Sequence, residues 1–449
     1  MFKKVLIANR GEIAVRIMRA CRELSVSSVA VYSEADRNSM HVKLADEAVC
    51  IGPAAAAKSY LNVPNVISAA EITECDAIHP GYGFLAENTD FADICKKYGI
   101  VFIGPESKVI ESMGNKAKAR DTMVKAGVPV VPGSDGILTG TIEESKKLAK
   151  KIGYPVLLKA SAGGGGKGMR VVRSEDEFEN ALAMAQMEAK AAFSNDDMYM
   201  EKFIETARHI EFQVLCDNFG NMVHLGERDC SVQRRHQKLI EESPSPALSD
   251  KARKKLGEYA IRACKAVNYT NAGTVEFIMA GPDEFYFMEM NTRLQVEHPV
   301  TELITGIDLV QEQLKIASGE KLAFTQKDIK FNGHAIEFRI NAENPDNNFA
   351  PSPGKITLFE PPLGPFVRMD TMAATNVDIL PFYDSLIAKV IVWGNDRNVS
   401  LARARRCLHE FGVEGVKTTI PLHLKIIENE KFIKGDIDTG FLEKELPKT

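Results

Sequence analysis

Residues 159–170 carry the sequence KASAGGGGKGMR, in which four consecutive glycines are followed by Lys167 and a fifth glycine. The flanking segments YPVLLKA (154–160) and MRVVRS (169–174) both have the apolar character of β-strands. The glycines therefore lie at the tip of a predicted β-hairpin and not at the start of a helix. Glycine N–H groups can approach phosphate oxygens without interference from side chains, at a cost in backbone entropy. We predict a phosphate-binding loop, with a flexible hairpin that binds no ligand as the alternative.

Two well-known nucleotide-binding patterns fail on this stretch. A Walker loop requires Ser or Thr after its Gly-Lys pair, but here Gly168 follows Lys167. The spacing G-x-G-x-x-G does occur, but it indicates a dinucleotide site only where a strand leads into a helix, and here a second predicted strand follows. Near the N-terminus, ANRGEIA (8–14) has one glycine where that pattern needs three. We therefore expect neither type of site.

Composition is that of an ordinary globular protein. The 449 residues favour about three domains. With 45% hydrophobic and 26% charged residues and a net charge of −5, nothing suggests a nucleic-acid or membrane partner. No apolar run approaches the roughly 18 residues that span a bilayer. The eight cysteines are scattered without a C-x-x-C pair, which favours a reducing cytoplasm over a disulfide framework or a zinc site.

The periodicity predicts an α/β and α+β protein. A βαβ unit is expected from strands at 4–9 and 28–33 around a helix at 12–24, and the parallel pattern recurs at 76–81 and 100–105. We expect a Rossmann-like α/β domain over 1–113, a central domain over 114–330 and an α+β domain over 331–449. The glycine loop belongs to a segment at about 131–203, and the chain becomes rich in strands after residue 204.

A second hairpin is predicted to oppose two glutamates. If the turn between TVEFIM (274–279) and YFMEMN (286–291) centres between Pro282 and Asp283, Met279 faces Tyr286 and Glu276 faces Glu289. Two directly opposed carboxylates repel, and magnesium bound by both and by nucleotide phosphates would compensate. The alternative is a bulge that shifts the register and leaves both glutamates solvated.

Polar residues alternate with apolar ones on two further strands. Every second residue is polar in HIEFQVL (209–215) and in AIEFRIN (335–341), which places one polar set on one face of each strand: His209, Glu211 and Gln213, and Glu337, Arg339 and Asn341. Such faces suggest a common cleft. The basic stretch QRRHQK (233–238) lies between these strands and is either a solvated charge run or the lining of an anion site.

Several segments together resemble the ATP-grasp ligases and, more specifically, the biotin carboxylase family. The resemblance runs in order along essentially the whole chain and rests on IANRGEIAVRI (7–17), HPGYGFLAEN (79–88), MGNKAKAR (113–120), KASAGGGGKGMR (159–170), ERDCSVQRRHQKLIEESP (227–244), MEMNTRLQVEHPVTELITG (288–306), AIEFRINAE (335–343) and PSPGKI (351–356). It implies an N-terminal α/β domain, a central ATP-grasp domain with a mobile glycine-rich lid and a C-terminal domain. It also implies a carbon–nitrogen ligase that joins bicarbonate to N1 of biotin with ATP and Mg²⁺ or Mn²⁺, through carboxyphosphate.

The resemblance further implies site residues, position by position. The implied ATP contacts are Lys116, Lys159, Gly164, Gly165, Gly166, Lys167, Gly168, Met169, Glu201, Lys202, Ile204, His209, Gln233, His236, Glu276 and Glu289. The implied metal ligands are Glu276 and Glu289, with Asn291 beside them. The implied bicarbonate pocket consists of Lys238, Arg293, Gln295, Val296 and Glu297, of which Glu297 would be the general base. Arg339 would stabilise the biotin enolate and, with Tyr82 and Gly83, contact biotin; Glu297, Arg339, Lys238 and Arg293 form the implied catalytic set.

Partners are implied in the same way. The chain ends soon after the C-terminal domain and lacks an Ala-Met-Lys-Met biotin-attachment sequence, so we expect a free-standing subunit of the bacterial acetyl-CoA carboxylase type, in fatty acid synthesis. It would act on biotin attached to a separate biotin carboxyl carrier protein and work with carboxyltransferase subunits. A cytoplasmic homodimer is expected, with the helix bearing Arg19 and Glu23 as a candidate interface. DTMAATNVDI (370–379) departs from the tyrosine-containing stretch common in the family, which leaves biotin-side or subunit contacts there undetermined.

Three alternatives remain open at this stage. The chain could serve another acyl-CoA carboxylase or a pyruvate carboxylase, because this domain does not select the acceptor. It could be another acylphosphate-forming ATP-grasp ligase, for example one like carbamoyl-phosphate synthetase. A nucleotide-binding sensor would bind ATP without turnover.

Overall fold

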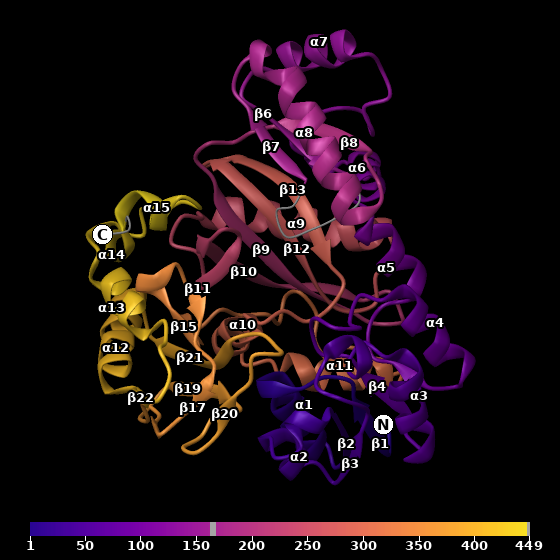
Figure 1. Ribbon diagram of the computed structural model, residues 1–449, viewed down its shortest axis with the longest axis vertical. Helices are drawn as coiled ribbons and strands as arrows, with labels where there is room; N and C mark the ends of the chain where they lie inside the picture. Colours follow the sequence, from indigo (N-terminus) through magenta and orange to yellow (C-terminus); the bar gives the residue numbers. More distant parts are fainter. Residues whose placement is uncertain (162–167, 447–449) are drawn as a thin grey trace.

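The structure is a computed structural model that describes residues 1–161 and 168–446. In Figure 1 the N-terminal part (indigo) and the C-terminal part (orange to yellow) lie side by side at the bottom, and helices α7 and α8 stand at the top. The predicted loop residues Gly164, Gly165, Gly166 and Lys167 lie outside the described residues. Their assignment to ATP stays a prediction.

The N-terminal part forms a parallel sheet in the order β3-β2-β1-β4-β5. Its strands are β1 (Lys4–Ile7), β2 (Ser27–Tyr32), β3 (Glu47–Cys50), β4 (Ala77–His79) and β5 (Val101–Phe102). Its helices are α1 (Gly11–Glu23), α2 (Met40–Leu44), α3 (Val63–Ile72), α4 (Thr89–Lys97) and α5 (Ser107–Gly114). Leu6 pairs with Val29 on one side and Ile78 on the other, and all three are fully buried, as expected for a sheet covered on both faces. The predicted parallel βαβ arrangement is confirmed.

The glycine hairpin lies in a small sheet of its own, ordered β7-β6-β8. This part contains α6 (Lys116–Lys125), α7 (Ile142–Ile152), β6 (Val156–Ala160), β7 (Met169–Val172), α8 (Glu175–Phe193) and β8 (Met198–Lys202). Strands β6 and β7 are antiparallel, and Lys159 pairs with Met169. The strand–loop–strand prediction is therefore confirmed. Gly168 has φ +69°, and a Cβ there would come within 2.9 Å of the Ala160 Cβ, so this position favours glycine.

The largest sheet runs in the order β13-β12-β9-β10-β11-β14-β21-β19. Its strands are β9 (Arg208–Cys216), β10 (Met222–Arg234), β11 (Gln237–Ser243), β12 (Asn271–Gly281), β13 (Glu284–Asn291), β14 (His334–Asn341), β19 (Val367–Thr371) and β21 (Leu386–Gly394). Helices α9 (Asp250–Ala266), α10 (His298–Thr305) and α11 (Leu309–Ala317) are inserted between its strands in the sequence. Because β11 pairs directly with β14, the sheet continues across the domain boundary expected at residue 330.

The C-terminal part packs helices and short strands around the end of this sheet. It contains the short strands β15 (Glu343–Asn344), β16 (Ala350–Pro351), β17 (Gly354–Lys355), β18 (Leu358–Glu360), β20 (Asp378–Ile379) and β22 (Gly412–Glu414). Its helices are α12 (Arg397–Glu410), α13 (Ile420–Glu428), α14 (Glu430–Lys434) and α15 (Phe441–Glu445). Leu401, Leu408 and Phe411 pack into one core with the apolar faces of β14 and β21.

The hairpin of β12 and β13 opposes the two glutamates but corrects the predicted register around them. Glu276 pairs with Glu289, as predicted. Met279 pairs with Phe285 and not with Tyr286, because the register shifts between Glu276 and Phe277 and shifts back near Gly281. Irregular residues of this kind insert into one strand only, and a symmetric count outward from the turn cannot reveal them.

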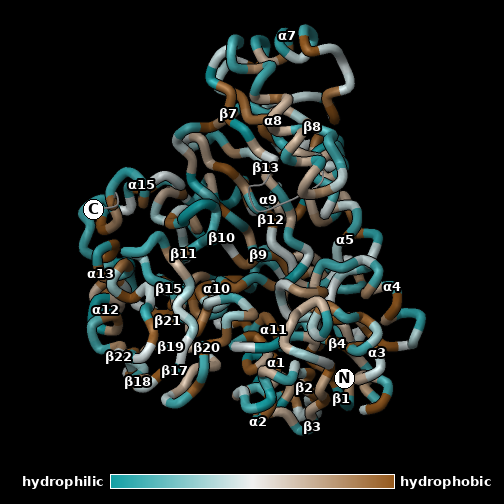
Figure 2. The backbone as a smooth tube through the Cα atoms, in the orientation of Figure 1, coloured by the Kyte–Doolittle hydropathy of each residue, from teal (hydrophilic) through white to brown (hydrophobic). Residues whose placement is uncertain are grey.

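The surface and the cysteines are those of a globular protein. In Figure 2 hydrophilic stretches follow the outer helices, for example α7 at the top. Across the described part of the chain, no helix is long and apolar enough to cross a membrane. All eight cysteines are free thiols, and of these only Cys50 is exposed. The sequence pattern had predicted no disulfide framework.

Candidate functional site

The site is built on the polar faces of the large sheet. Ile210, Phe212 and Val214 of β9 lie in the hydrophobic core, so the alternate residues of that strand point to the other side. The same alternation on β14 buries Ile336, Phe338 and Ile340 in the C-terminal core. Charged side chains from β9, β11, β12 and β14 meet there, which supports the expected common cleft.

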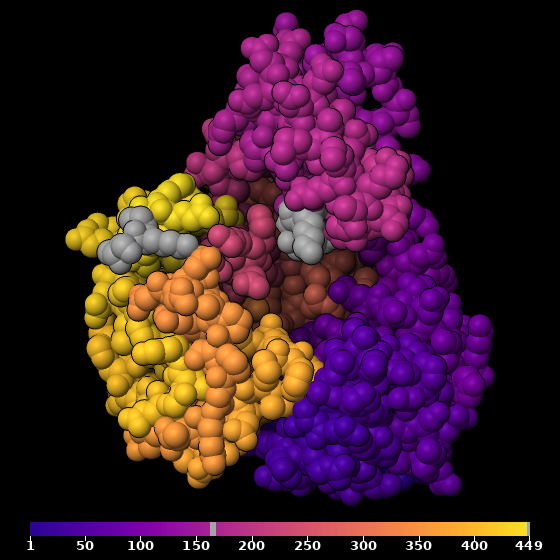
Figure 3. All heavy atoms as spheres, in the orientation of Figure 1, coloured from indigo at the N-terminus to yellow at the C-terminus, as the bar shows by residue number. Residues whose placement is uncertain are grey.

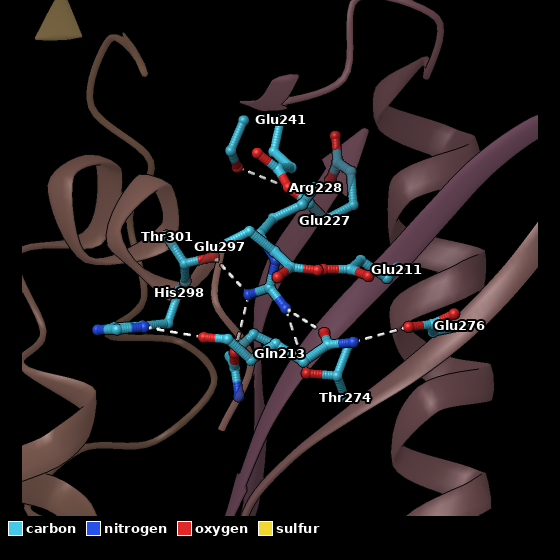
Figure 4. A network of polar contacts seen from close by, with 12 residues as sticks. Glu211, Gln213, Glu227, Arg228, Glu241, Thr274, Glu276, Glu297, His298 and Thr301 are labelled. Carbon is cyan, nitrogen blue, oxygen red and sulfur yellow. Dashed lines mark hydrogen bonds and ion pairs between the residues drawn. The ribbon is translucent and has the colours of Figure 1, made fainter. Parts of the chain in front are cut away.

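Arg228 of β10 organises the floor of the site (Figure 4). Its side chain is fully buried, and Nε lies 2.5 Å from Oε1 of Glu211. The remaining donors bond four neutral side-chain oxygens, at 2.8 Å to Gln213, 3.0 Å to Thr301, 3.2 Å to Thr274 and 3.0 Å to Gln295. Sequence reasoning missed Arg228, because the run Glu227–Asp229 resembles an exposed charge cluster. The available signal was its place inside a strand-rich segment.

Lys238 of β11 gathers three carboxylates. Its Nζ lies 2.5 Å from Glu211, 3.2 Å from Glu276 and 2.6 Å from Glu297. Burial alone would lower the pKa of Lys238, but the three carboxylates hold that pKa well above its ordinary value. Of the two interpretations of the basic stretch 233–238, this position of Lys238 supports the lining of an anion site.

Glu297 lies between two cations at the start of α10. One carboxylate oxygen is 2.6 Å from Lys238 Nζ, and the other is 2.9 Å from Arg339 Nη2. The residue is 2% exposed. Burial alone would raise the pKa of Glu297, but Lys238, Arg339 and Arg228 hold it well below its ordinary value. The group is therefore an ionised carboxylate at neutral pH.

Arg339 connects Glu297 with a second buried glutamate. Its Nε donates to Oε1 of Glu241 at 2.6 Å. Burial raises the pKa of Glu241 to about 7, although Arg339 opposes the shift. Glu241 pairs across the strands with Glu337, and burial raises the pKa of Glu337 well above its ordinary value. Arg339 therefore extends over a partly neutral acidic pair, with its guanidinium directed at Glu297.

The predicted metal ligands lie together, with their oxygens engaged by protein groups. Glu276 accepts from His209 at 2.8 Å and from Asn291 at 2.8 Å. Glu289 lies 3.6 Å from Lys116 Nζ. Burial alone would lower the pKa of His209, but the Glu276 carboxylate 2.8 Å away raises it. Two opposed carboxylates and an amide are the oxygen donors that Mg²⁺ prefers, so this chemistry fits a magnesium ion.

The acidic side of the site is denser than these three residues. Single ligand atoms of His209, Glu211 and Glu276 lie within 4.8 Å of one another, and so do those of Glu211, Cys230 and Glu297. Lys238 bonds the glutamates of both groups, so its ammonium already neutralises the charge there.

The predicted nucleotide contacts lie on or beside the lid segment, residues 131–203. Lys159 Nζ is 2.5 Å from Glu201, and Arg120 approaches the same carboxylate at 3.5 Å. Lys202 donates to the carbonyls of Gly153 and Tyr154, each at 2.9 Å. Met169 is half-buried on β7, and Ile204 is half-buried just beyond β8. Gln233 of β10 is buried opposite Lys238, and His236 is exposed at the β10–β11 turn.

Arg293 is oriented by a residue that sequence reasoning missed. Its Nε lies 2.8 Å from Glu87, and its Nη2 donates to Oδ1 of Asn291 at 3.0 Å. Glu87 also accepts from the backbone N–H of Thr292 at 3.0 Å. Glu87 belongs to HPGYGFLAEN, one of the segments on which the resemblance to the family rests. No local sequence pattern, however, predicts a contact between residue 87 and residue 293.

The predicted biotin contacts come from the N-terminal part. The hydroxyl of Tyr82 donates to Oε1 of Glu12, and its carbonyl accepts from Asn9 at 2.8 Å. Burial raises the pKa of Tyr82 well above its ordinary value, so the hydroxyl keeps its proton. Gly83 is exposed with φ +68°. Figure 3 shows the molecular surface hollowed between the lid segment (magenta) and the two lower parts of the chain.

Three family models match the chain in succession. Residues 1–110 match "Biotin carboxylase, N-terminal domain", and residues 115–325 match "Carbamoyl-phosphate synthase L chain, ATP binding domain". Residues 337–444 match "Biotin carboxylase C-terminal domain".

Curated relatives match over nearly the full length. Biotin carboxylase 1 of Bacillus subtilis is 59% identical over 444 residues, covering 99% of this chain and 98% of the relative. A pyruvate carboxylase subunit of Methanothermobacter thermautotrophicus is 54% identical, covering 99% of this chain and 90% of the relative.

Solved structures agree with the fold. The biotin carboxylase–β-γ-ATP complex of Campylobacter jejuni has a TM-score of 0.96 and 52% identity, covering 99% of each chain. The biotin carboxylase domain dimer of the Hydrogenobacter thermophilus 2-oxoglutarate carboxylase, in complex with MgADP, ADP and bicarbonate, has a TM-score of 0.94 and 52% identity, covering 99% of this chain and 98% of the other. The chain thus has an N-terminal parallel-sheet domain, an ATP-grasp domain and a C-terminal domain, and it belongs to the biotin carboxylase family of ATP-grasp ligases.

Proposed function

We propose that the protein uses ATP and Mg²⁺ or Mn²⁺ to carboxylate biotin on a separate carrier protein with bicarbonate. The observation that carries the proposal is the Glu297 carboxylate, which lies 2.6 Å from Lys238 Nζ and 2.9 Å from Arg339 Nη2 in a buried site. A buried base flanked by two cations suits the deprotonation of a small oxyanion, because the cations stabilise the additional negative charge.

Bicarbonate binding would switch the basicity of Glu297. Lys238 and Arg339 now hold the pKa of this carboxylate far too low for it to accept a proton readily. A bound bicarbonate would take hydrogen bonds from these two donors, and the pKa of Glu297 would then rise toward the value of an ordinary buried glutamate. Glu297 would take the bicarbonate proton, and the resulting oxyanion would attack the γ-phosphorus of ATP, forming carboxyphosphate and releasing ADP.

Carboxyphosphate would then break down to CO₂ and phosphate. The phosphate would take the N1 proton of biotin, and N1 would attack CO₂. Arg339 would stabilise the negative charge of the biotin enolate, because its guanidinium has a donor that faces Glu297. Arg293, oriented by Glu87, would complete the bicarbonate pocket with Gln295 and Val296. Tyr82 and Gly83 would border the biotin ring.

A metal ion would be held by Glu276 and Glu289, beside Asn291. When bound, it would neutralise phosphate charge during transfer of the γ-phosphoryl group. Lys116, Lys159 and His209 would contact the phosphates, and the glycine loop would cover them and exclude water. Glu201, Lys202 and Ile204, with Gln233 and His236, would border the adenine. We assign these roles to three domains, an N-terminal domain over 1–113, an ATP-grasp domain over 114–330 and a C-terminal domain over 331–449.

Replacing Glu289 with lysine tests the metal site. Glu289→Lys places a cation opposite Glu276, so we expect the dependence of ATP hydrolysis on Mg²⁺ to be lost together with at least about 100-fold of the rate. The measurement is the rate at increasing Mg²⁺ with ATP held saturating. Glu284→Lys, at the exposed far end of the same strand, is the matched control. An unchanged Mg²⁺ titration in Glu289→Lys would contradict the assignment.

Membership of the family supports a proposal for the partners. We propose a cytoplasmic homodimer that acts with a biotin carboxyl carrier protein and carboxyltransferase subunits. It would catalyse the first half-reaction of acetyl-CoA carboxylase, which supplies malonyl-CoA for fatty acid synthesis. A carboxylase for pyruvate or 2-oxoglutarate is the second candidate, because relatives of both kinds match the full chain. Reconstitution with each set of carrier and carboxyltransferase subunits distinguishes them by the carboxylated product.

An apolar surface near β19 supports the dimer. Leu363 is 73% exposed and Phe366 is 61% exposed, next to the Trp393 ring. We expect Phe366→Asp to shift the protein from dimer to monomer in light scattering, because it places a charge in an apolar contact. Phe219→Asp, at a similarly exposed phenylalanine in a different loop, is the control and should remain dimeric.

The decisive assay is ATP hydrolysis by the wild-type protein with Mg²⁺. We expect hydrolysis to require bicarbonate and to rise further on addition of free biotin. Bicarbonate-dependent hydrolysis without stimulation by biotin would indicate a different acylphosphate-forming ligase. ATP binding without hydrolysis would indicate a nucleotide sensor, and either result would overturn the proposal.

A further inference from the structure

A row of buried and half-buried acidic and basic side chains, which includes Arg339, crosses the large sheet. In the strand register Glu241 pairs with Glu337, Arg339 with Lys389, and Lys389 with Asp370. Paired residues of antiparallel strands point to the same side of a sheet, so these side chains share the face that carries Arg339. Lys389, at the centre of the row on β21, is fully buried.

Three separate parts of the chain meet at the Lys389 ammonium. Its Nζ donates to the carbonyl of Val296 at 2.8 Å. It also lies 3.1 Å from Oε1 of Glu12 on α1 and 3.8 Å from Asp370 on β19. The ammonium therefore donates a hydrogen bond to the turn before α10 and forms ion pairs with the N-terminal domain and with the neighbouring strand.

Glu12 connects Lys389 with Tyr82. The Tyr82 hydroxyl donates to the same Oε1 of Glu12 that faces Lys389. The ammonium thus binds the carbonyl of Val296, the residue that precedes the proposed general base Glu297. Through the Glu12 carboxylate it is also connected to Tyr82, the tyrosine proposed to lie at the biotin side. No other described lysine or arginine contacts both Val296 and Glu12.

We propose that Lys389 is a positioning residue that sets the Val296–Glu297 turn and, through Glu12, the Tyr82 ring in one geometry. The proposal rests on the roles assigned above to Glu297 and Tyr82. Lys389 touches no reacting atom. It joins the Glu12 carboxylate of the N-terminal domain and the Val296 carbonyl of the ATP-grasp domain to a strand of the C-terminal domain, so the two half-sites keep a constant separation.

The strength of the anchor follows from its burial. Burial alone would lower the pKa of Lys389, but Glu12, Glu337 and Asp370 raise it, so the group remains charged. The nearby cation Arg368 opposes this shift, and the neighbouring His298 is neutral, because burial and the Lys389 charge hold its pKa well below its ordinary value. A charged donor held in a nearly water-free site bonds a carbonyl more strongly than a neutral one does, which suits a role in orientation.

The test compares two substitutions of Lys389 with a matched control. Lys389→Met removes the ammonium and keeps the approximate length of the stem. Lys389→Arg keeps the charge but cannot reproduce all three contacts. Arg397→Met is the control, because Arg397 lies in the C-terminal domain like Lys389 but pairs with Glu242 of β11, outside the row. The measurements are kcat and KM for bicarbonate and biotin, the Kd for ATP and the thermal midpoint.

We expect Lys389→Met to lower kcat of bicarbonate-dependent ATP hydrolysis by about 10- to 100-fold, since a displacement of about 1 Å at a reacting group costs that much. The Kd for ATP should stay within about twofold, because the nucleotide residues lie elsewhere. KM for biotin should rise in the same variant. Glu12→Gln should raise KM for biotin by a larger factor than it lowers kcat/KM for bicarbonate, because Glu12 contacts Tyr82 directly and reaches the Val296–Glu297 turn only through Lys389.

Three outcomes would overturn the inference. They are wild-type kinetics in Lys389→Met, a loss of activity in proportion to a loss of folded protein or ATP affinity, and equal kinetic losses in Lys389→Met and Arg397→Met. If Lys389→Met does not fold, Lys389→Arg decides, with reduced kcat at a near-wild-type thermal midpoint supporting the inference and wild-type kinetics overturning it. Failure of the proposed function is recognised separately, because the wild-type protein would then show no turnover stimulated by biotin.

Discussion

Glu297→Gln should lower bicarbonate-dependent ATP hydrolysis by about 10³-fold while leaving ATP binding intact, within the usual contribution of a positioned base. The amide keeps the size of the side chain but accepts no proton at neutral pH. It also weakens the contacts with Lys238 and Arg339, which now lie at 2.6 and 2.9 Å. The measurements are steady-state hydrolysis with saturating bicarbonate, and the Kd for ATP by calorimetry.

The controls for Glu297→Gln separate chemistry from charge. Glu320→Gln, at an exposed glutamate beyond α11, should have wild-type activity. Glu297→Asp keeps the base but withdraws it, so it should retain more activity than the amide variant. A Glu297→Gln protein that hydrolyses ATP at the wild-type rate, or that has lost ATP affinity to the same extent as activity, would refute the role of general base.

Arg228→Met should destabilise the protein by about 3–5 kcal/mol, the typical cost of breaking a buried ion pair from one side. Methionine fills much of the space, but Glu211 would lose a cation that now lies at 2.5 Å. Gln213, Thr274, Thr301 and Gln295 would each lose a hydrogen bond from the guanidinium. The measurement is the free energy of unfolding from urea titration.

A surface pair provides the comparison for Arg228. Lys434 and Glu430 form an exposed i,i+4 pair at 3.1 Å, and Lys434→Met should change the free energy of unfolding by no more than about 0.5 kcal/mol. In the double variant Arg228→Met/Glu211→Gln, part of the lost stability should return, since the unpaired carboxylate is gone. A single-variant loss below about 1 kcal/mol would contradict the view that Arg228 holds the floor of the site together.

The continuous sheet explains why these predictions concern residues from distant parts of the chain. Strands β11 and β14 pair directly, so the ATP-grasp and C-terminal domains share one hydrogen-bonded surface. Lys238 and Glu241 on the first strand therefore keep a constant distance from Arg339 on the second. A catalytic set that must be held within fractions of an ångström is better placed on such a sheet than on opposed loops.

Sequence patterns predicted the strands and their exposed faces because apolar side chains repeat within a few residues along such elements. Apolar runs and alternation identified the parallel sheet, the hairpin of β6 and β7, and the polar faces of β9 and β14. They also placed Glu276 opposite Glu289. The prediction for Met279 was wrong by one residue, because a bulge changes the register without changing the period. The assignments of residues to substrates stay predictions.

Tertiary structure alone decided which charges meet, and those contacts bridge large distances in the sequence. Lys238 and Glu297 are 59 residues apart, Arg339 and Glu241 are 98 apart, and Arg293 and Glu87 are 206 apart. A charged residue such as Arg228 or Lys389 looks exposed in the sequence, because burial depends on which other strands cover it. Periodicity predicts the face of an element on which a side chain lies, but it does not predict which side chain it will contact. The contacts of Lys389 with Val296 and Glu12 are what distinguish it from a solvated surface lysine.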